Sequence, residues 1–371
     1  MKRFHVIAAG LSLAFAASAF AQLSTSPSVT TIRENPSNVT GTTTVQQSTA
    51  GVLSIVTNNA QQQIVITVGP VAGEVDISGV SVPAGTPLTG ITAIELTTGR
   101  AQDYVEFVFL TPQAPNVTLN TGLGISDVKF IYLIDATPET ASSNVTVTGN
   151  SANDLVSFTV ESRAAAFAAN WNVSGGAGNN EVVANINSPE ASESMSISLN
   201  GSATTGQDKL ELFAIHSAAL TNISLGGSLG SNSDVATVLV DSLNPADTTL
   251  AFNLNMGAGA DASNIEFITR GGTASASGSL LGGDGIDALT FKLEQDGAVN
   301  VTIDGGSGND LIDYALKGLV TGTPTLLGGI GNDELKLVVD GPQLATPFFD
   351  GGPGFDIAIG FGTFVNVEQI N

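Results

Sequence analysis

The sequence that decides the fold reads GGDGID at residues 282–287 and recurs as GGSGND at 305–310, GGIGND at 328–333 and GGPGFD at 351–356. The glycine pairs begin at residues 282, 305, 328 and 351, so the interval is 23 residues each time. A fixed interval of about 20–50 residues is typical of a solenoid, in which each repeat forms one coil stacked on the last. The repeat therefore predicts architecture more directly than it predicts activity.

A looser form of the same turn extends the pattern towards the N-terminus. In seven further places a turn, most of them with glycine, ends in Asp or Asn before an apolar strand. The eleven closing residues are Asp103, Asp127, Asp154, Asn180, Asp208, Asp234, Asp261, Asp287, Asp310, Asp333 and Asp356, at spacings of 24, 27, 26, 28, 26, 27, 26, 23, 23 and 23 residues. This series predicts about eleven coils.

Backbone chemistry explains why such a turn gives a coil. Glycine adopts positive φ without strain, so Gly-Gly-x-Gly makes a tight reversal, and the closing Asp accepts hydrogen bonds from nearby main-chain amides. Strands of successive coils then pair in parallel about 4.8 Å apart, which for eleven coils gives a rod on the order of 50 Å long. The expected fold class is all-β, a single-stranded parallel β-helix (β-solenoid) with glycine-rich turns. The alternative is an antiparallel sandwich, and only Arg163–Ala169 has a weak helical pattern.

In several coils the strand just before the turn starts with Asn-x-Thr or Asn-x-Ser. These strands are at residues 116–119, 144–147, 222–225 and 300–303. Apolar residues are expected to face inward and the intervening Thr and Ser outward. The motif is also a glycosylation acceptor, but its recurring place favours an Asn that starts the strand and stacks on its neighbours. An adhesive or ice-binding face would need aligned threonines, and Ser224 interrupts the series Thr118, Thr146 and Thr302.

The first residues have the composition of an export signal. Lys2 and Arg3 precede an apolar run at 6–17, and Ala19-Phe20-Ala21 fits the small-x-small cleavage pattern. The run is shorter than the roughly 20 residues that a membrane span needs. We therefore expect a signal peptide at 1–21, a polar leader or N-terminal cap at 22–50, and a β-solenoid domain at 51–371 with the strict turns concentrated at 280–360. The expected location is secreted (extracellular) or periplasmic, in a bacterium.

Charge and cysteine content exclude several classes of partner and site. Removing residues 1–21 leaves 371 − 21 = 350 residues and takes away two cations, so the net charge moves from −23 to −25. Nucleic acids and anionic membranes both bind clustered cations, which this chain lacks. The chain has no cysteine, so it has neither a disulfide framework nor a cysteine-linked lipid anchor.

In-register stacking places the closing Asp of each coil above that of the next. Two carboxylates about 5 Å apart repel by about 0.8 kcal/mol in bulk water and about 3 kcal/mol at an effective dielectric near 20. Across a column of about ten, this repulsion is comparable with a domain's total stability of about 5–15 kcal/mol. It must be relieved by splaying towards solvent, by protonation or by a cation. Calcium suits such a site, because it takes about six to eight oxygen ligands in a flexible geometry.

The strict turns resemble the calcium-binding nonapeptide Gly-Gly-x-Gly-x-Asp-x-apolar-x of RTX, or haemolysin-type, repeat proteins. The matching segments are residues 282–290, 305–313, 328–336 and 351–359, within about 80 of the 350 residues that follow the predicted signal peptide. In that family calcium lies between stacked turns, held by the Asp side chain and turn carbonyls. The resemblance therefore implies calcium as the cofactor, with up to three sites between four turns.

The metal-site residues that we predict fall into three groups. They are the closing residues Asp287, Asp310, Asp333 and Asp356; the nearby carboxylates Asp284, Asp304, Asp313 and Asp350; and the turn glycines Gly283, Gly285, Gly306, Gly308, Gly329, Gly331, Gly352 and Gly354.

Two departures from the family pattern matter. RTX repeats usually run in tandem every nine residues and form a roll with turns at both edges, whereas the interval here is 23. Members exported by the type I route typically lack a cleaved N-terminal signal. The expectation is therefore a β-helix with RTX-like turns at one edge, and the competing hypothesis is that the Asp side chains only cap turns.

Enzyme activity is the less favoured interpretation, and no catalytic residue is identified. His216 is the only histidine after residue 21, and its neighbours Phe213 and Ile215 indicate a strand residue rather than a base or ligand. The alternative is a carbohydrate-active β-helix enzyme, a polysaccharide lyase or hydrolase, which would use Asp pairs or calcium with Arg163 or Arg270.

The leading hypothesis is a secreted, non-enzymatic calcium-binding β-helix protein with a structural or adhesive role at the bacterial cell surface or in the matrix. Its expected partners are calcium ions and polysaccharide or other cell-surface components, with no nucleic acid and no membrane span. Residues 364–371 read as a final strand, whose open edge favours a cap or end-to-end self-association.

Overall fold

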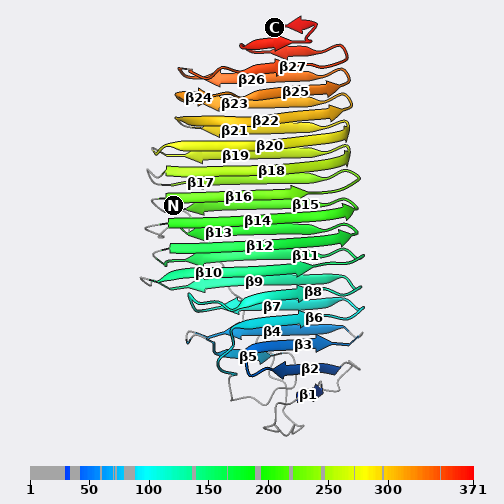
Figure 1. Cartoon of the computed structure of the whole chain (residues 1–371), viewed down its shortest axis with the longest axis vertical. Coiled ribbons are helices and arrows are strands. Elements are labelled where there is room, and N and C mark those ends of the chain that lie inside the picture. Colours follow the sequence, from blue (N-terminus) through cyan, green and yellow to red (C-terminus); the bar gives the residue numbers. More distant parts are fainter. Residues whose placement is uncertain are drawn as a thin grey trace, which may run out of the picture.

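The computed structural model describes residues 30–33, 42–58, 61–69, 71, 73–78, 88–135, 139–164, 166–188, 194–216, 220–243, 247–270, 272–294, 296–342 and 344–371. The predicted signal peptide at 1–21 lies outside these residues. Within them the chain is all-β and contains no helix, so none that could span a membrane. The strands stack as parallel coils and form a β-solenoid, as predicted (Figure 1).

The strands form two sheets, and the chain alternates between them. Sheet A consists of β1 (Thr30–Arg33), β2 (Thr42–Gln47), β3 (Val52–Thr57), β6 (Ala93–Thr97), β8 (Asn116–Asn120), β10 (Thr140–Thr148), β12 (Ala166–Ala177), β14 (Ser194–Thr205), β16 (Leu220–Ser228), β18 (Asp247–Gly259), β20 (Ala274–Gly285), β22 (Gly297–Ser307), β24 (Val320–Gly322), β25 (Thr325–Ile330), β27 (Phe348–Asp350) and β29 (Thr363–Val365). Sheet B consists of β4 (Gln62–Val68), β5 (Val75–Ser78), β7 (Asp103–Phe109), β9 (Ser126–Ile134), β11 (Leu155–Ser162), β13 (Glu181–Ser188), β15 (Lys209–His216), β17 (Val235–Ser242), β19 (Ala262–Thr269), β21 (Ala288–Glu294), β23 (Leu311–Lys317), β26 (Glu334–Asp340), β28 (Ile357–Ile359) and β30 (Gln369–Ile370).

The solenoid has about nine turns, slightly fewer than the eleven expected. The full coils run from β8 to β26, and the coils at both ends are irregular. At the N-terminal end β1, β2 and β3 pair antiparallel, as do β4 and β5. At the C-terminal end β27 to β30 have only two or three residues each, so residues 364–371 are not one strand.

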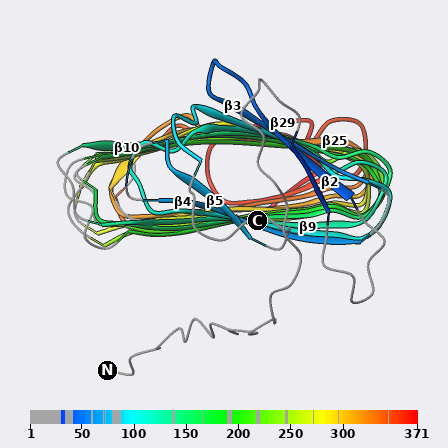
Figure 2. The ribbon, with the colours of Figure 1, turned by 90° about the horizontal axis from the view of Figure 1, so that it is seen from below.

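Parallel pairing in register excludes the antiparallel sandwich. Every neighbouring pair from β6 to β30 is parallel in its sheet, and the coils superimpose when viewed along the long axis (Figure 2). Arg163–Ala169 does not form a helix, because Ala166 to Ala169 belong to β12. Its small and aromatic residues alternate between buried and half-buried positions, as in a strand.

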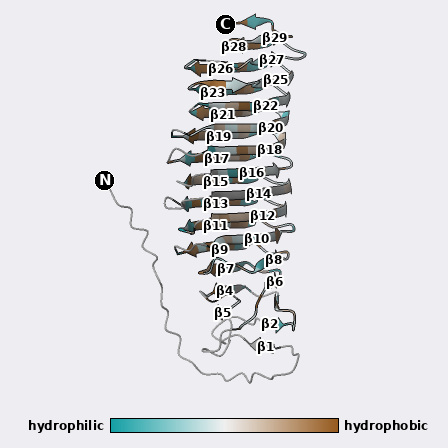
Figure 3. Ribbon diagram, turned by 60° about the vertical axis from the view of Figure 1, so that its left-hand side comes forward, coloured by the Kyte–Doolittle hydropathy of each residue, from teal (hydrophilic) through white to brown (hydrophobic). Residues whose placement is uncertain are grey.

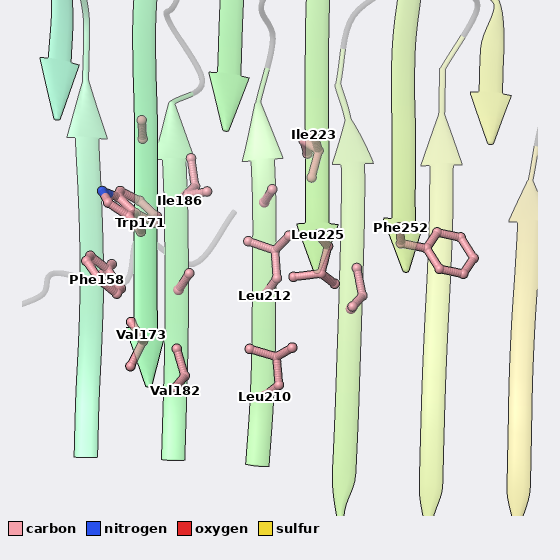
Figure 4. Packing of buried hydrophobic residues seen from close by; sticks show 14 of the residues in the cluster. Phe158, Trp171, Val173, Val182, Ile186, Leu210, Leu212, Ile223, Leu225 and Phe252 are labelled. Carbon is pink, nitrogen blue, oxygen red and sulfur yellow. The ribbon is translucent and has the colours of Figure 1, made fainter. Parts of the chain in front are cut away.

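The core lies between the two sheets and is filled by alternate residues of each strand. In β9 and along most of β12 buried and less buried residues alternate, so one face of each strand packs inward and the other meets solvent. Figure 3 shows hydrophobic and hydrophilic residues mixed along the strands. Figure 4 shows part of this core, where residues from both sheets, among them Phe158, Trp171 and Leu212, point into the same space.

Aromatic side chains stack along the core in the N-terminal half. Phe107, Phe130 and Phe158 occupy one register position of sheet B, with ring centroids 4.9 and 5.0 Å apart. Trp171 from sheet A stacks on Phe158 at 4.2 Å and donates from Nε1 to the Ser143 hydroxyl at 2.8 Å. Like residues therefore repeat along the axis and fix the register of the coils.

Charged side chains on sheet B join neighbouring coils. All five lysines after residue 21 lie on sheet B strands and form ion pairs there. Lys209 pairs with Glu181 at 3.1 Å, and Lys292 pairs with Glu266 at 2.7 Å, in both cases across one coil spacing. These pairs are half-exposed, so each contributes at most about 1 kcal/mol.

The two edges of the solenoid tolerate length differences unequally. At the glycine-turn edge the register is continuous, and Gly257, Gly283 and Gly306 occupy one position in three successive coils. At the opposite edge the connections range from residues 189–193 between β13 and β14 to residues 295–296 between β21 and β22. The irregular repeat length is therefore mostly absorbed at that second edge.

Truncation of a stacked core aromatic is expected to destabilise several coils at once. Phe158→Ala removes a fully buried ring that stacks on both Phe130 and Trp171, so we expect a loss of about 3–5 kcal/mol in the free energy of unfolding. Guanidinium unfolding followed by circular dichroism measures it. Thr159→Ala on the outer face of the same strand is the control, and an equal effect of both variants would contradict this account of the core.

Candidate functional site

The closing Asp residues lie in a single file at the glycine-turn edge, and their side chains point inward. Asp287, Asp310, Asp333 and Asp356 are only 0–3 % exposed. Each of them directly precedes a sheet B strand, so the parallel register of these strands places the four residues above one another. The four acidic residues of the strict turns are therefore brought together as expected, but inside the coil and not splayed towards solvent.

A main-chain amide of one coil donates to the carboxylate of the next. The Asp287 N–H donates to Oδ1 of Asp310 at 2.9 Å, and the Asp310 N–H donates to Oδ1 of Asp333 at 2.8 Å. The same bond recurs through the column, from Asp154 and Asn180 through Asp208, Asp234 and Asp261 to Asp356. At the C-terminal end the Asp356 N–H donates to Oε2 of Glu368 at 2.8 Å, so Glu368 takes the place of a further Asp.

A second ladder runs beside the first in the opposite direction, and the sequence interpretation missed it. The Asn332 N–H donates to Oδ1 of Asn309 at 2.8 Å, and the Phe355 N–H donates to Oδ1 of Asn332 at 2.8 Å. Here the side chain of one coil accepts from the following coil, whereas each Asp accepts from the preceding one. The Asn before the closing Asp was the available signal, and it stands in two of the four strict turns.

The second carboxylate oxygen of each Asp is buried without a hydrogen-bond partner among the described residues. This holds for Oδ2 of Asp208, Asp234, Asp261, Asp287, Asp310, Asp333 and Asp356. Such an oxygen, when ionised, loses its hydration without replacement, which is unfavourable by about 1–3 kcal/mol or more for a charged group. The column therefore repeats one unfavourable group in each coil from Asp208 to Asp356.

The first glycine of each turn leaves the space into which this oxygen points. A Cβ built on Gly305 would lie 2.5 Å from Oδ2 of Asp310 and 2.6 Å from the carbonyl oxygen of Gly328. A Cβ on Gly328 would meet Asp333 Oδ2 and the Gly351 oxygen at 2.5 and 2.6 Å. A carboxylate oxygen and a carbonyl oxygen of the next coil thus face the same space, and neither can donate a hydrogen bond to the other.

Asn180 shows what relieves this arrangement. It occupies the same position in the column, and its Oδ1 accepts from the Asp154 N–H at 3.2 Å. Its Nδ2 stands where the other coils have Oδ2, and it donates to the carbonyl of Gly178 at 2.9 Å and to Oδ1 of Asp208 at 3.0 Å. In the coils from Asp208 onward Oδ2 has no donor among the described residues, so a proton or a cation is needed to join it to a neighbouring oxygen.

Burial raises the pKa of the carboxyls in the column. It raises the pKa of Asp234 to about 7, and the neighbouring Asp261 and Asp208 add to the rise. Burial also raises the pKa of Asp261 and Asp310 to about 6, despite the hydrogen bonds that each accepts from a main-chain amide. For Asp208, Asp287, Asp333 and Asp356 the direction and the main cause are the same.

The four additional carboxylates lie in different places. Asp304 and Asp350 lie at the turn end of sheet A, two coils apart in one register position that Leu327 shares. Asp284 is exposed in its turn. Asp313 is not at the turn, because strand alternation after Asp310 sends it to the outer face of sheet B, where its Oδ2 pairs with Lys336 at 3.0 Å.

The turn glycines stack tightly along the axis. Gly283 and Gly285 have φ of +111° and +145°, and the equivalent glycines of the next two coils are also in this region. A Cβ at Gly306 or Gly308 would overlap the carbonyl oxygen of Gly283 or Gly285 in the preceding coil. The carbonyls of the second and third glycines thus point along the axis at the next coil. The carbonyl that faces the Asp Oδ2 belongs to the first glycine, which is not among the predicted metal-site residues.

The N-terminal coils differ from the strict ones. Asp127 is not in the column: Ser126 pairs in register with Asp103, and its N–H donates to Oδ1 of Asp154 at 3.0 Å. A shift of one residue moves a side chain to the other face of a strand, so Asp127 lies outside. Asp154 has partners for both oxygens, because Thr121 Oγ1 donates to its Oδ2 at 3.0 Å. The unbroken series of unsatisfied Oδ2 atoms among the described residues therefore runs from Asp208 to Asp356.

His216 and Arg270, two of the residues considered for catalysis, contact other side chains of the solenoid. His216 is fully buried in β15, its Nδ1 lies 3.1 Å from Thr221 Oγ1, and burial lowers its pKa to about 4. Arg270 makes a two-pronged ion pair with Asp241, at 3.0 and 2.7 Å. Among the described residues no three acidic or histidine side chains gather as a metal cluster, so carbonyl oxygens would have to complete any metal site in the column.

Without divalent cations the protein is expected to be more stable in mild acid than at neutral pH. A carboxyl whose folded pKa lies above its ordinary value near 4 contributes stability below that value, and loses it as the pH rises through the folded pKa. In chelator we therefore expect the melting temperature to fall between pH 4 and about 7, the pKa to which Asp234 is raised. Asp234→Asn should flatten this dependence, and Asp313→Asn should not. A melting temperature that rises over this range would be the contrary result.

The third glycine of the turn is expected to be irreplaceable. Gly308→Ala places a Cβ on the Gly285 carbonyl oxygen at a φ of +150°, so both the backbone and the coil spacing must change. We expect a loss of about 3 kcal/mol or more, since strain and overpacking each cost about 1–3 kcal/mol. Ser307→Ala is the control, and equal denaturation midpoints for the two variants would refute the tight axial stacking.

Searches with family models, among curated proteins and among solved structures find no match to this chain.

Proposed function

We propose that this protein is an exported, non-enzymatic β-solenoid that binds calcium in its C-terminal turns and has a structural or adhesive role at the bacterial cell surface or in the matrix. The observation that carries the proposal is the row of buried Oδ2 atoms without hydrogen-bond partners among the described residues. In the strict turns, the Oδ2 atoms of Asp287, Asp310 and Asp333 each face a glycine carbonyl of the next coil. These are hard oxygen donors of the kind that calcium prefers. The resemblance of the same turns to RTX repeats supports this ion.

The residues that would hold calcium come from adjacent coils. Between the second and third strict turns they are Oδ2 of Asp310 and the carbonyl oxygen of Gly328, with further turn carbonyls. The equivalent pairs are Asp287 with Gly305 and Asp333 with Gly351. Bound calcium would supply positive charge between oxygens that otherwise repel, and so would join one coil to the next. Asp208, Asp234 and Asp261 also have an orphaned oxygen, but their turns lack the first glycine, so the proposal is limited to the strict turns.

Protonation alone is a weaker explanation at neutral pH. The pKa values are raised to about 6 for Asp261 and Asp310 and to about 7 for Asp234, so at pH 7 protons do not neutralise the whole column. Lysine does not compensate them, because the lysines of the described coils are paired on the outer face of sheet B. Extracellular calcium modules bind their ion with Kd values of about 10⁻⁴–10⁻³ M, so even weak sites fill outside the cell.

Calcium should raise the melting temperature of protein that has been freed of metal. An ion present at about 100 times its Kd stabilises the folded state by about 2.7 kcal/mol per site. Differential scanning calorimetry in calcium and in chelator, with titration calorimetry, measures this. If no heat of binding is found and the two melting curves coincide, the calcium sites do not exist.

Asp310→Asn separates calcium binding from simple turn capping. We expect this variant to melt above the wild type in chelator, because an amide can donate at this place as Asn180 does. In calcium it should gain less than the wild type, because one carboxylate ligand is lost. Asp313→Asn on sheet B is the matched control. A variant that gains as much from calcium as the wild type would show that Asp310 only caps the turn.

A further inference from the structure

We propose that the outer face of sheet A between β8 and β22 binds an extended, uncharged, hydroxyl-rich polysaccharide. The proposal names a ligand for the adhesive role proposed above, and rests on that role, but it uses residues remote from the calcium sites. We call this surface the neutral face and define it as the outward residues of sheet A from Asn116 to Thr302.

Polar residues on this face form columns along the solenoid axis. Thr118, Thr146 and Thr302 occupy one register position, and Ser224 does not. Other residues still separate Thr146 from Thr302, so the threonines do not form a continuous row. The residues of this column whose side chains are described are Thr118, Thr146, Asn172, Gly226, Asn253, Ser279, Thr302 and Thr325. Ser224 belongs to the neighbouring column, which also holds Asn144, Asn170 and Asn300. The face is therefore a grid of hydroxyl and amide groups.

Charge is almost absent from this face, although the protein as a whole is strongly acidic. The eight sheet A strands from β8 to β22 contain three charged residues, Asp247, Asp284 and Asp304, which lie towards strand ends. Each of the eight sheet B strands of the same coils, β9 to β23, carries at least one charged residue. Interface cores are depleted in charge, because docking would bury it without a partner. The asymmetry therefore marks sheet A as the docking side and an uncharged partner as its ligand.

The side-chain chemistry matches sugar hydroxyls. Ser, Thr and Asn both donate and accept hydrogen bonds, and so do the hydroxyl groups of a neutral polysaccharide. These side chains are short, so little rotamer entropy is lost on binding. The aromatic residues of the same strands, Phe167, Trp171 and Phe252, are buried, so stacking on sugar rings does not contribute. Binding to each sugar must then be weak, and affinity must come from many contacts along a long polymer.

The dimensions of the face suit a polymer surface. Eight coils span seven intervals of about 4.8 Å, or about 34 Å, and four outward columns about 6.8 Å apart span about 20 Å. The product is on the order of 700 Å², close to the roughly 800 Å² that each partner contributes to a stable interface. A second copy of this chain fits less well, because two molecules with a net charge of −23 each repel at their edges.

Retention on insoluble neutral polysaccharide tests this inference. The probes are microcrystalline cellulose, chitin and particulate β-1,3-glucan, in 150 mM salt with calcium, and the unbound protein is measured after centrifugation. We expect at least one of them to retain the wild type, and short soluble oligosaccharides of the same sugar to compete poorly. Retention only on anionic pectate, no retention on any of the three, or a dimer that is lost in the neutral-face variant would overturn the proposal.

Two charge-matched triple variants locate the binding surface. Thr146→Glu, Asn253→Glu and Thr302→Glu place three charges on the neutral face, and we expect at least tenfold weaker retention. Thr159→Glu, Thr237→Glu and Asn264→Glu place three charges on sheet B, and retention should stay within about twofold. Equal loss in both would assign binding to net charge and refute the neutral face.

Calcium-dependent melting separates the two proposals and verifies folding. Normal calcium stabilisation without retention on any probe would overturn the polysaccharide inference alone. Retention with no calcium response would overturn the calcium sites alone. If the neutral-face triple variant does not fold, Asn253→Glu and its control Asn264→Glu replace the triples, with an expected loss of about threefold against no change.

Discussion

The hydrogen bond from a main-chain amide of one coil to an aspartate carboxylate of the next is the interaction on which the solenoid depends. Each such bond, as between Asp287 and Asp310, fixes the height, the register and the direction of the turn at once. It requires an inward carboxylate, and in the strict turns the second oxygen of that carboxylate points into the space that the first glycine leaves open. The same bond leaves the second oxygen buried and unsatisfied within the described residues. The carboxylate that fixes the register of the coils is thus also the group whose second oxygen needs a proton or a cation.

Much of the fold could be predicted from the sequence, because the determining features are local and repeat. The glycine pairs and closing Asp residues specify parallel coils, and the strand positions follow from alternation. The limits are equally physical. Asp127 and Ser126 are adjacent, and only the cross-coil bond to Asp154 decides which one enters the column. The coil number was too high because closing residues continue into terminal coils whose strands are short or irregular.

The sequence predicts that the closing carboxylates are aligned, but it does not predict which groups surround them. The sequence placed Asp287 to Asp356 in one file, yet it did not show whether they face solvent or the interior. It also grouped Asp313 with them from nearness in the chain, although alternation sends it to the outer face. The contribution of the first glycine carbonyl depends on the spacing between coils, which a motif does not encode. That three threonines of the neutral face share one register position was hidden because the repeat length varies between 23 and 28 residues.

That variation in length has a consequence for how this protein evolves and how it could be engineered. Because the connections between β13 and β14 and between β21 and β22 differ in length while the glycine turns stay in register, one rim is free to accept insertions and the other is not. New loops can be grafted onto the edge opposite the glycine turns, one per coil, without disturbing the column of closing Asp residues. The solenoid is therefore a repeat scaffold in which successive loops on this edge lie about 4.8 Å apart along the axis.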